Sequence, residues 1–189
     1  MIVKHSVSWW WSRLKEGPSW LKSILGARYW LRSCDQVGAN TRTFWRPSIE
    51  NRGRIVLGTR VRLNSNWAPV ELVSGPQGSI DIGDGVFINY GSMISAQLRV
   101  RIGSNVMLGN YCIVADTETP GVGDPPGGPV IAPRPVEIGD GAWLAARVTV
   151  LPGARIGAGA VIAAGSIVAG DIPAGALAGG IPARVLRPK

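Results

Sequence analysis

The sequence predicts an all-β fold, a coil of short strands joined by tight corners, on three observations. Aliphatic residues recur at every sixth position from residue 138 to residue 168. The residue that follows is Gly or Ala in five of these six repeats, as expected where a corner brings backbones close together. The chain holds 26 Gly and 14 Pro with no three-residue period, which excludes collagen. Three strand-and-corner units of this kind close a triangular coil of about 18 residues.

Residues 1–54 are expected to precede the coil as a basic, tryptophan-rich and partly helical segment. Residues 1–62 carry twelve basic and three acidic side chains, and six of the eight tryptophans lie before residue 46. After Gly17-Pro18, Ser19 is a suitable N-cap for a helix that runs to about residue 32. The apolar stripe of this helix contains Trp20, Leu21, Ile24, Leu25, Ala27 and Leu31.

Three roles remain open for this basic helix. The preferred one is packing on the side or base of the coil. Alternatively, residues 1–32 contact an anionic membrane surface, because interfacial Trp and basic side chains favour that location. Nucleic-acid binding is a weaker option, since the charge favours it but no motif supports it.

The coil is expected over residues 55–175. Weak copies of the hexad begin at Leu57 and Leu63. Further copies begin at Ile82, Ile88, Ile94, Ile102, Leu108 and Val114, with a two-residue slip before Ile102, and the six regular copies follow from Ile138. Fourteen hexads predict a stack of about four to five coils with one continuous core.

One loop interrupts the coil, and a tail ends it. Residues 120–137 contain six Pro and four Gly, a composition that cannot continue the hexads. We therefore expect an extruded loop, and loops on a rigid scaffold often carry binding and catalysis. Residues 176–189 are expected to form a C-terminal tail.

The scarcity of His and Cys excludes several classes of site. The chain has one histidine, His5, so a zinc site of three histidines cannot come from one chain, and we expect no metal. Cys34 and Cys112 are too few for a secreted disulfide scaffold. No secretory signal or spanning segment is visible. We therefore expect a cytoplasmic protein, with contact to the inner face of the membrane as an option.

Four stretches resemble the hexapeptide-repeat acyltransferases, and most of all the sugar and exopolysaccharide O-acetyltransferases of the maltose and nodulation type. They are Ile82-Gly-Asp-Gly-Val-Phe-Ile-Asn89, Val100-Arg-Ile-Gly-Ser-Asn-Val-Met-Leu108, Ile138-Gly-Asp-Gly-Ala-Trp-Leu144 and Gly179-Gly-Ile-Pro-Ala-Arg184. The resemblance covers about residues 55–189. It implies a left-handed parallel β-helix, a homotrimer with active sites between subunits, acetyl-CoA or another acyl-CoA as donor, and a role in polysaccharide biosynthesis.

The resemblance also implies catalytic positions, one of which has changed. Asn89 matches an asparagine that positions the acceptor or the catalytic groups. The family's catalytic base is a histidine before a proline, and here Thr119 stands before Pro120. Asp116 and Glu118 lie beside this position. Each is either a base with a pKa raised by burial or a solvated loop carboxylate.

The donor side of the resemblance rests on small residues. In the family, the pantetheine arm bonds to the backbone of small residues on successive coils, and Ala145, Ala146, Ala163 and Ala164 match those positions. The tail arginines Arg184 and Arg187 are either contacts for the nucleotide phosphates or plain surface charge.

Together these features predict a CoA-dependent O-acyltransferase that transfers an acyl group, acetyl in the first instance, directly to a hydroxyl of a sugar or glycan precursor. The alternative is a catalytically silent β-helix that serves as a binding or assembly subunit.

Overall fold

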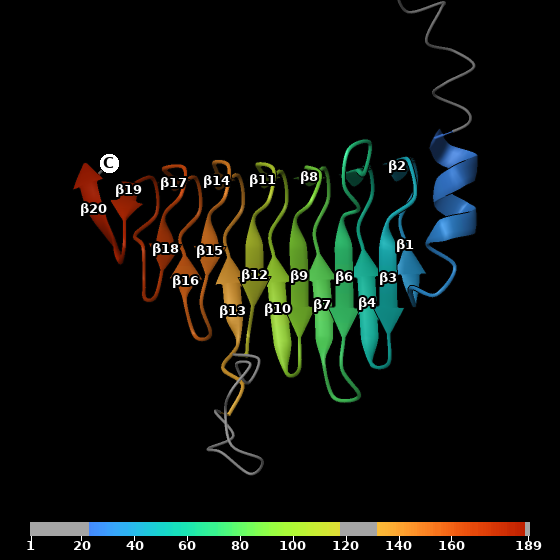
Figure 1. Ribbon diagram of the computed structural model, residues 1–189, viewed down its shortest axis with the longest axis horizontal. Helices are drawn as coiled ribbons and strands as arrows, with labels where there is room; N and C mark the ends of the chain where they lie inside the picture. Colours follow the sequence, from blue (N-terminus) through green and yellow to red (C-terminus); the bar gives the residue numbers. More distant parts are fainter. Residues whose placement is uncertain (1–22, 118–131, 188–189) are drawn as a thin grey trace, which may run out of the picture.

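The chain folds into a left-handed parallel β-helix, as predicted. The structure, a computed structural model, describes residues 23–117 and 132–187. Three parallel sheets run along one axis, and the coils are stacked along it from the blue end of the chain to the red end (Figure 1). Each coil passes from sheet A to sheet B, then to sheet C, and then to the next coil. We name the turns between these sheets the A–B, B–C and C–A corners.

The strands of the three sheets alternate regularly along the chain. Sheet A contains β1 (Gln36–Val37), β4 (Arg54–Leu57), β7 (Ser79–Ile82), β10 (Arg99–Ile102), β13 (Val136–Ile138) and β16 (Arg155–Ile156). Sheet B contains β2 (Arg42–Phe44), β5 (Arg62–Asn64), β8 (Phe87–Ile88), β11 (Met107–Leu108), β14 (Trp143–Leu144), β17 (Val161–Ile162), β19 (Leu177–Gly180) and β20 (Ala183–Arg187). Sheet C contains β3 (Ser48–Asn51), β6 (Glu71–Ser74), β9 (Met93–Ala96), β12 (Ile113–Ala115), β15 (Thr149–Val150) and β18 (Ile167–Val168).

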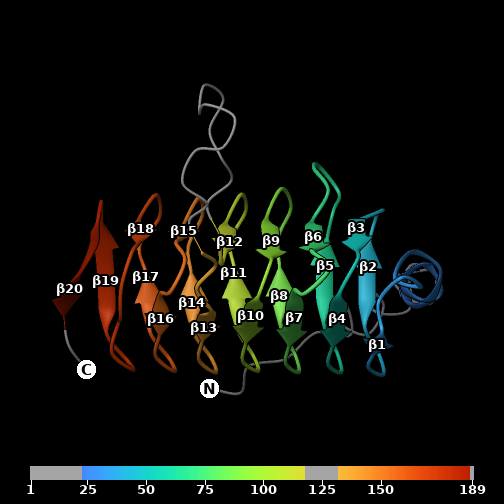
Figure 2. The ribbon, with the colours of Figure 1, turned by 90° about the horizontal axis from the view of Figure 1, so that it is seen from below.

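The hexad aliphatics form the core. Along sheet B, each strand places one fully buried aliphatic residue directly over the one in the coil before it. These residues are Leu63, Ile88, Leu108, Leu144 and Ile162. Neighbouring strands lie about 4.8 Å apart, so the stacked side chains leave no space for water. Figure 2 shows the strands of sheet B following one another along the axis.

The boundaries of the β-helix differ from the predicted 55–175. The first coil is already formed by β1, β2 and β3, each paired in parallel with a strand of the second coil. The sequence hides this coil because Thr41 and Thr43 occupy buried positions where later coils place aliphatic residues. At the other end, β19 continues sheet B, and only β20 turns back antiparallel to it.

Coil length explains the two-residue slip in the hexads. Ile138 pairs with Ile156 across a regular 18-residue coil. Ile82 pairs with Ile102, two residues farther along, because β9 and β10 are both four-residue strands separated by a short C–A corner.

A helix over residues 23–30 covers the open end of the core beside β1 (Figure 1). Ala27 and Leu31 are each 1% exposed and belong to the core cluster. This confirms the preferred packing role for the described part of the segment; Trp20 and Leu21 lie outside the described residues. Among the residues that the structure describes, no helix is long and apolar enough to span a membrane.

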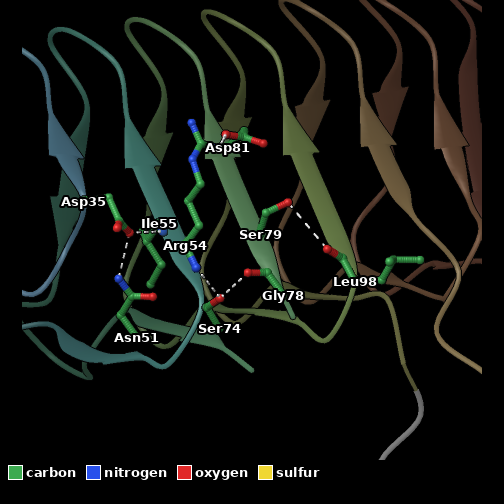
Figure 3. Close-up of polar contacts among 9 residues, drawn as sticks. All are labelled: Asp35, Asn51, Arg54, Ile55, Ser74, Gly78, Ser79, Asp81 and Leu98. Atoms are coloured by element: carbon green, nitrogen blue, oxygen red, sulfur yellow. Dashed lines mark hydrogen bonds and ion pairs between the residues drawn. The ribbon is translucent and has the colours of Figure 1, made fainter. Parts of the chain in front are cut away.

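Polar side chains tie the first coils together near the C–A corner (Figure 3). Asp35 Oδ2 accepts hydrogen bonds from Asn51 Nδ2 (2.9 Å) and from the Ile55 amide (2.8 Å). These bonds hold the pKa of Asp35 below its usual value, with the Ile55 amide as the main cause. Ser74 Oγ donates to the Gly78 carbonyl (2.8 Å) and closes the longer turn of the second coil.

Candidate functional site

One column of residues follows sheet B at the B–C corner and changes character along its length. Its members directly follow the paired core residues of successive coils: Asn64, Asn89, Gly109, Ala145, Ala163 and Gly179. We call this set the site column. Its first two members carry amide side chains, and the remaining four carry a methyl group or a hydrogen. The structure therefore brings the predicted Asn89 into line with the predicted Ala145 and Ala163.

The amide end of the site column is a hydrogen-bonded pair. Asn64 Nδ2 donates to Asn89 Oδ1 (2.8 Å), which also accepts the Tyr90 amide (3.0 Å). Because a backbone N–H must meet an oxygen, the Tyr90 contact fixes the orientation of the Asn89 amide. Asn89 Oδ1 is thus occupied, and within residues 23–117 and 132–187 Asn89 Nδ2 donates to no protein acceptor. Two N–H donors remain for a ligand.

The small-residue end of the site column is shaped by backbone contact. The amides of Gly109, Ala145 and Ala163 each donate to a core residue of the next coil at 2.8–2.9 Å. A Cβ on Gly109 would lie 2.6 Å from the Ala146 nitrogen, so this position requires glycine. Ala164 is exposed, and Ala145, Ala146 and Ala163 are half-buried. The column here presents backbone rather than side chains to solvent.

Cations lie at the far end of the site column. Gly179 is the register partner of Arg184 across the β19–β20 pair. Arg184 is exposed, and its Nη1 donates to the Ala183 carbonyl (3.2 Å). Arg187 is also exposed and lies opposite Leu177 on the same pair. Both predicted arginines therefore lie near the small-residue end, on the side away from Asn89.

Aromatic residues that sequence reasoning missed flank the amide end. Trp67 and Tyr90 stack with ring centroids 6.2 Å apart, and Tyr90 meets Tyr111 edge to face at 5.6 Å. Trp67 is 84% exposed. Asn64 was missed as well, although its position after Leu63 corresponds to that of Asn89 after Ile88. Aligning the weak hexads with the strong ones would have identified it.

Asp116 has a structural environment. It is fully buried at the C–A corner, and its carboxylate accepts the amides of Gln97 (2.8 Å), Leu98 (2.7 Å) and Arg99 (2.6 Å). The interpretation as a solvated loop carboxylate is wrong, and these three bonds favour support of the preceding turn over the role of a base. The two other positions predicted beside it, Glu118 and Thr119, lie outside the described residues.

The two predicted halves of the active site leave the coil at different corners. The site column lies at the B–C corner. The chain enters the predicted loop after β12 and returns at β13, which is the C–A corner. Sheet C lies between these corners, so within one chain the structure does not bring the start of the loop and Asn89 together.

Neither cysteine has the character of a nucleophile. Cys112 is buried behind the site column, where its Sγ donates to the Ala145 carbonyl (3.1 Å) and burial raises its pKa. Burial, together with the charge of Asp35, raises the pKa of Cys34 to about 11. Within the described part of the chain, no cluster of three or more His, Cys, Asp or Glu side chains forms a potential metal site.

Comparison with known proteins agrees with this geometry. Residues 135–170 match the family model of the bacterial transferase hexapeptide (six repeats). The chain is 29% identical over 140 residues to the galactoside O-acetyltransferase of Escherichia coli, covering 74% of this chain and 69% of that protein. It is 28% identical over 156 residues to a probable acetyltransferase of Mycobacterium tuberculosis, covering 75% of this chain and 52% of that protein. The chain thus spans about half the length of that relative.

A solved structure shares the fold. A mutant of AntD, an N-acyltransferase from Bacillus cereus in complex with dTDP and coenzyme A, matches with a TM-score of 0.70 at 22% identity over 86% of each chain. The resemblance predicted from the hexads is therefore confirmed, because the repeat is present and the similar proteins are acyltransferases.

Proposed function

We propose that this hexapeptide-repeat chain is an acyltransferase that moves an acyl group from coenzyme A to a hydroxyl of a sugar or glycan precursor in the cytoplasm. The observation that carries the proposal is the site column, in which Asn89, whose Nδ2 donates to no acceptor among the described residues, is followed along the column by a strip of small residues. Similar proteins are named for CoA complexes and for galactoside acetylation, which supports the donor and the acceptor class.

The small-residue strip suits the donor. An extended pantetheine arm carries amides that need backbone partners and an unobstructed surface, which side chains larger than Ala would block. Arg184, the register partner of Gly179 at the end of the strip, is assigned to a phosphate of the nucleotide. The thioester then lies toward the amide end, and the acceptor lies beyond it.

The reaction is a direct transfer of the acyl group from the sulfur of coenzyme A to the oxygen of the acceptor. The acceptor oxygen bonds to the thioester carbonyl carbon, the C–S bond breaks, and the hydroxyl proton ends on the released thiol of coenzyme A. The Nδ2 group of Asn89 donates to the oxygen that becomes negative, which is the type of contact that stabilises such transition states.

The base is assigned to Glu118. Asp116 is committed to three backbone amides, and Thr119 lacks a basic group at neutral pH. A general base contributes about 10²–10⁴-fold, so a replacement for the family's histidine decides whether transfer is fast or slow.

We further propose a homotrimer whose neighbouring copy completes the site. Within one chain the described ends of the loop, Thr117 and Ala132, lie at the C–A corner and Asn89 lies at the B–C corner, which supports a site shared with a second copy. The outer face of sheet B supports such contact with one apolar row: Phe87, Met107, Trp143, Val161 and Leu177. Trp143 and Met107 are about half exposed in the single chain.

Release of free thiol from acetyl-CoA in the presence of hexoses, disaccharides and amino sugars tests the proposal. We expect thiol release that depends on a hydroxyl acceptor, a lower rate for Glu118→Gln and a higher rate for Thr119→His. Mass spectrometry of the product identifies the acylated atom and separates O- from N-transfer.

The second candidate is a catalytically silent β-helix that binds or assembles, and it is favoured by Thr119 in place of a base. It predicts that wild type and both variants neither bind coenzyme A nor release thiol. That result would remove the acyltransferase assignment while leaving the trimer intact.

A further inference from the structure

Three arginines converge on one hollow at the A–B corner, on the opposite edge of sheet B from the site column. The hollow has a volume of about 330 Å³. It is lined by Asn40, Arg42, Arg60, Arg62, Gly85 and Asn105. No acidic residue belongs to this lining among the residues that the structure describes. These residues come from four successive coils, which explains why the sequence alone does not show the cluster.

The arginines repel one another in the unliganded chain. Arg42 and Arg62 are direct register partners on neighbouring strands, about 4.8 Å apart. Like charges at such positions destabilise a sheet. Burial, and then the charge of Arg62, lower the pKa of Arg42, so the cluster carries an electrostatic cost that a bound anion would remove.

Two arginines outside the hollow form ion pairs within the described part of the chain. Arg54 forms an ion pair with Asp81 on sheet A, and Arg52 pairs with Glu50 at 2.7 Å. Asp84 precedes the lining residue Gly85, and its Oδ1 accepts the Thr59 amide (2.7 Å). The charge of Arg60 is only the last of the causes that lower the pKa of Asp84.

The lining also has the geometry of a polar cradle. Arg62 lies over the Phe87 ring, with its guanidinium carbon 5.2 Å from the ring centroid, and this contact restrains the orientation of the guanidinium group. Asn40, Arg60 and Asn105 adopt left-handed backbone conformations with φ of 58°, 56° and 57°. Arginine forks and Asn amides together match the oxygens of phosphate better than a single cation does.

We propose that this hollow binds a phosphate monoester or diphosphate other than the acyl donor. Its volume lies in the range of small-molecule sites and admits a diphosphate with part of the attached group. The phosphate belongs to a small molecule or to a lipid headgroup, since both present the same oxygens.

The position of the hollow links it to the acceptor. Arg62 and Asn64 are two residues apart on β5, so they leave the same face of the strand about 7 Å from each other. This step, unlike the binding of phosphate itself, rests on the proposed function. The acceptor is then a sugar phosphate or diphosphate, with its phosphate bound by the arginines and its sugar beside Asn64 and Asn89.

Calorimetric titration of the full chain with inorganic pyrophosphate at low salt tests the hollow. We compare wild type with Arg42→Gln/Arg62→Gln, and with Arg99→Gln/Arg155→Gln, which removes the same charge from exposed positions on sheet A. We expect the hollow variant to bind at least about tenfold more weakly, and the control variant to bind as wild type does. Arg60→Gln, a single change at an exposed turn, provides a second variant should the double one fail to fold.

Two further measurements identify the molecule that carries the phosphate and test the repulsion between the arginines. Cosedimentation with phosphatidylglycerol vesicles, lost only in the hollow variants, assigns the phosphate to a lipid; pyrophosphate binding alone assigns it to a small molecule. Without ligand, added salt should raise the melting temperature of wild type more than that of the hollow variant, because salt screens the repulsion between the arginines. Absence of both kinds of binding, equal loss in hollow and control variants, or displacement of pyrophosphate by coenzyme A would overturn the proposal. No readout depends on acyl transfer, so failure of the proposed function leaves this test intact.

Discussion

The two halves of the β-helix satisfy the same backbone demand with different residues. At the A–B corner, successive coils need one residue with a left-handed backbone conformation. The C-terminal half uses glycine there, as at Gly141 and Gly159, which adopt this conformation without strain. The N-terminal half uses glycine at Gly85 but Asn40, Arg60 and Asn105 in its other three coils, although a side chain in this region costs about 1–2 kcal/mol. The N-terminal coils therefore give up stability and in return place side chains at the corner.

The site column repeats this contrast at the B–C corner. Its N-terminal members, Asn64 and Asn89, supply amide groups, whereas Ala145 and Ala163 supply only a smooth backbone surface. Each difference falls on positions outside the core. Core packing restricts which residues can point inward in a β-helix, whereas the corner residues can vary. One half can therefore have functional side chains at its corners while the other half has regular, small corner residues.

The largest effect is expected where the two halves meet. Asp116→Ala leaves three partly buried backbone amides without their carboxylate acceptor and should lower the free energy of unfolding by about 3 kcal/mol. Asp171→Ala, at an exposed C–A corner position of the regular half, should change it little. Urea denaturation measures both. A stable Asp116→Ala protein that has lost only transfer activity would restore Asp116 as a base.

The next largest effect tests whether the amide end of the site column takes part in the reaction. Asn89→Ala should lower the rate of acyl transfer by about 10²–10³-fold, the usual result of losing one oxyanion donor. Binding of coenzyme A, measured by thermal shift, should not change, because the donor strip is intact. Asn66→Ala is the matched control, since only the backbone amide of Asn66 contacts Asn64. Equal rates for the two variants would exclude Asn89 from the reaction.

A smaller effect is expected in the donor strip. Ala164→Leu adds an exposed branched side chain to the smooth end and should raise KM for acetyl-CoA about tenfold, an energy of about 1.4 kcal/mol. Its kcat should change less, because the amide end is untouched. Ala174→Leu adds the same side chain at an exposed A–B corner position and should leave KM unchanged. A raised KM in both variants would mean that the donor does not follow this corner.

The contrast also explains what could be predicted from the sequence. The hexads of residues 138–168 identify strands and corners because each hexad buries one aliphatic side chain in the core. This pattern is local in the sequence, and every sixth residue follows it. The first coil escapes the same rule, since Thr41 and Thr43 replace the aliphatic residues. Asn89 is found because it lies inside a regular motif. The bonds of Asp116 join residues 17 to 19 positions apart in a coil of irregular length, so only the folded register reveals them.

The smallest effect concerns pH and belongs to the first coil. The amide of Ile55 and the side chain of Asn51 hold the pKa of Asp35 below its unfolded value of about 3.9. A depressed pKa contributes stability that is fully present above the unfolded pKa and is lost as the pH falls through the folded pKa. Asp35→Asn removes this contribution. The difference in unfolding free energy between wild type and variant should be constant above about pH 5 and should shrink below about pH 4.

Hydrogen exchange should show that acid first releases amides of β1 and the helix over residues 23–30, while the coils after residue 138 stay protected. Acid lability that begins in the regular half instead would contradict the view that side-chain contacts, and their sensitivity to conditions, are concentrated in the N-terminal coils.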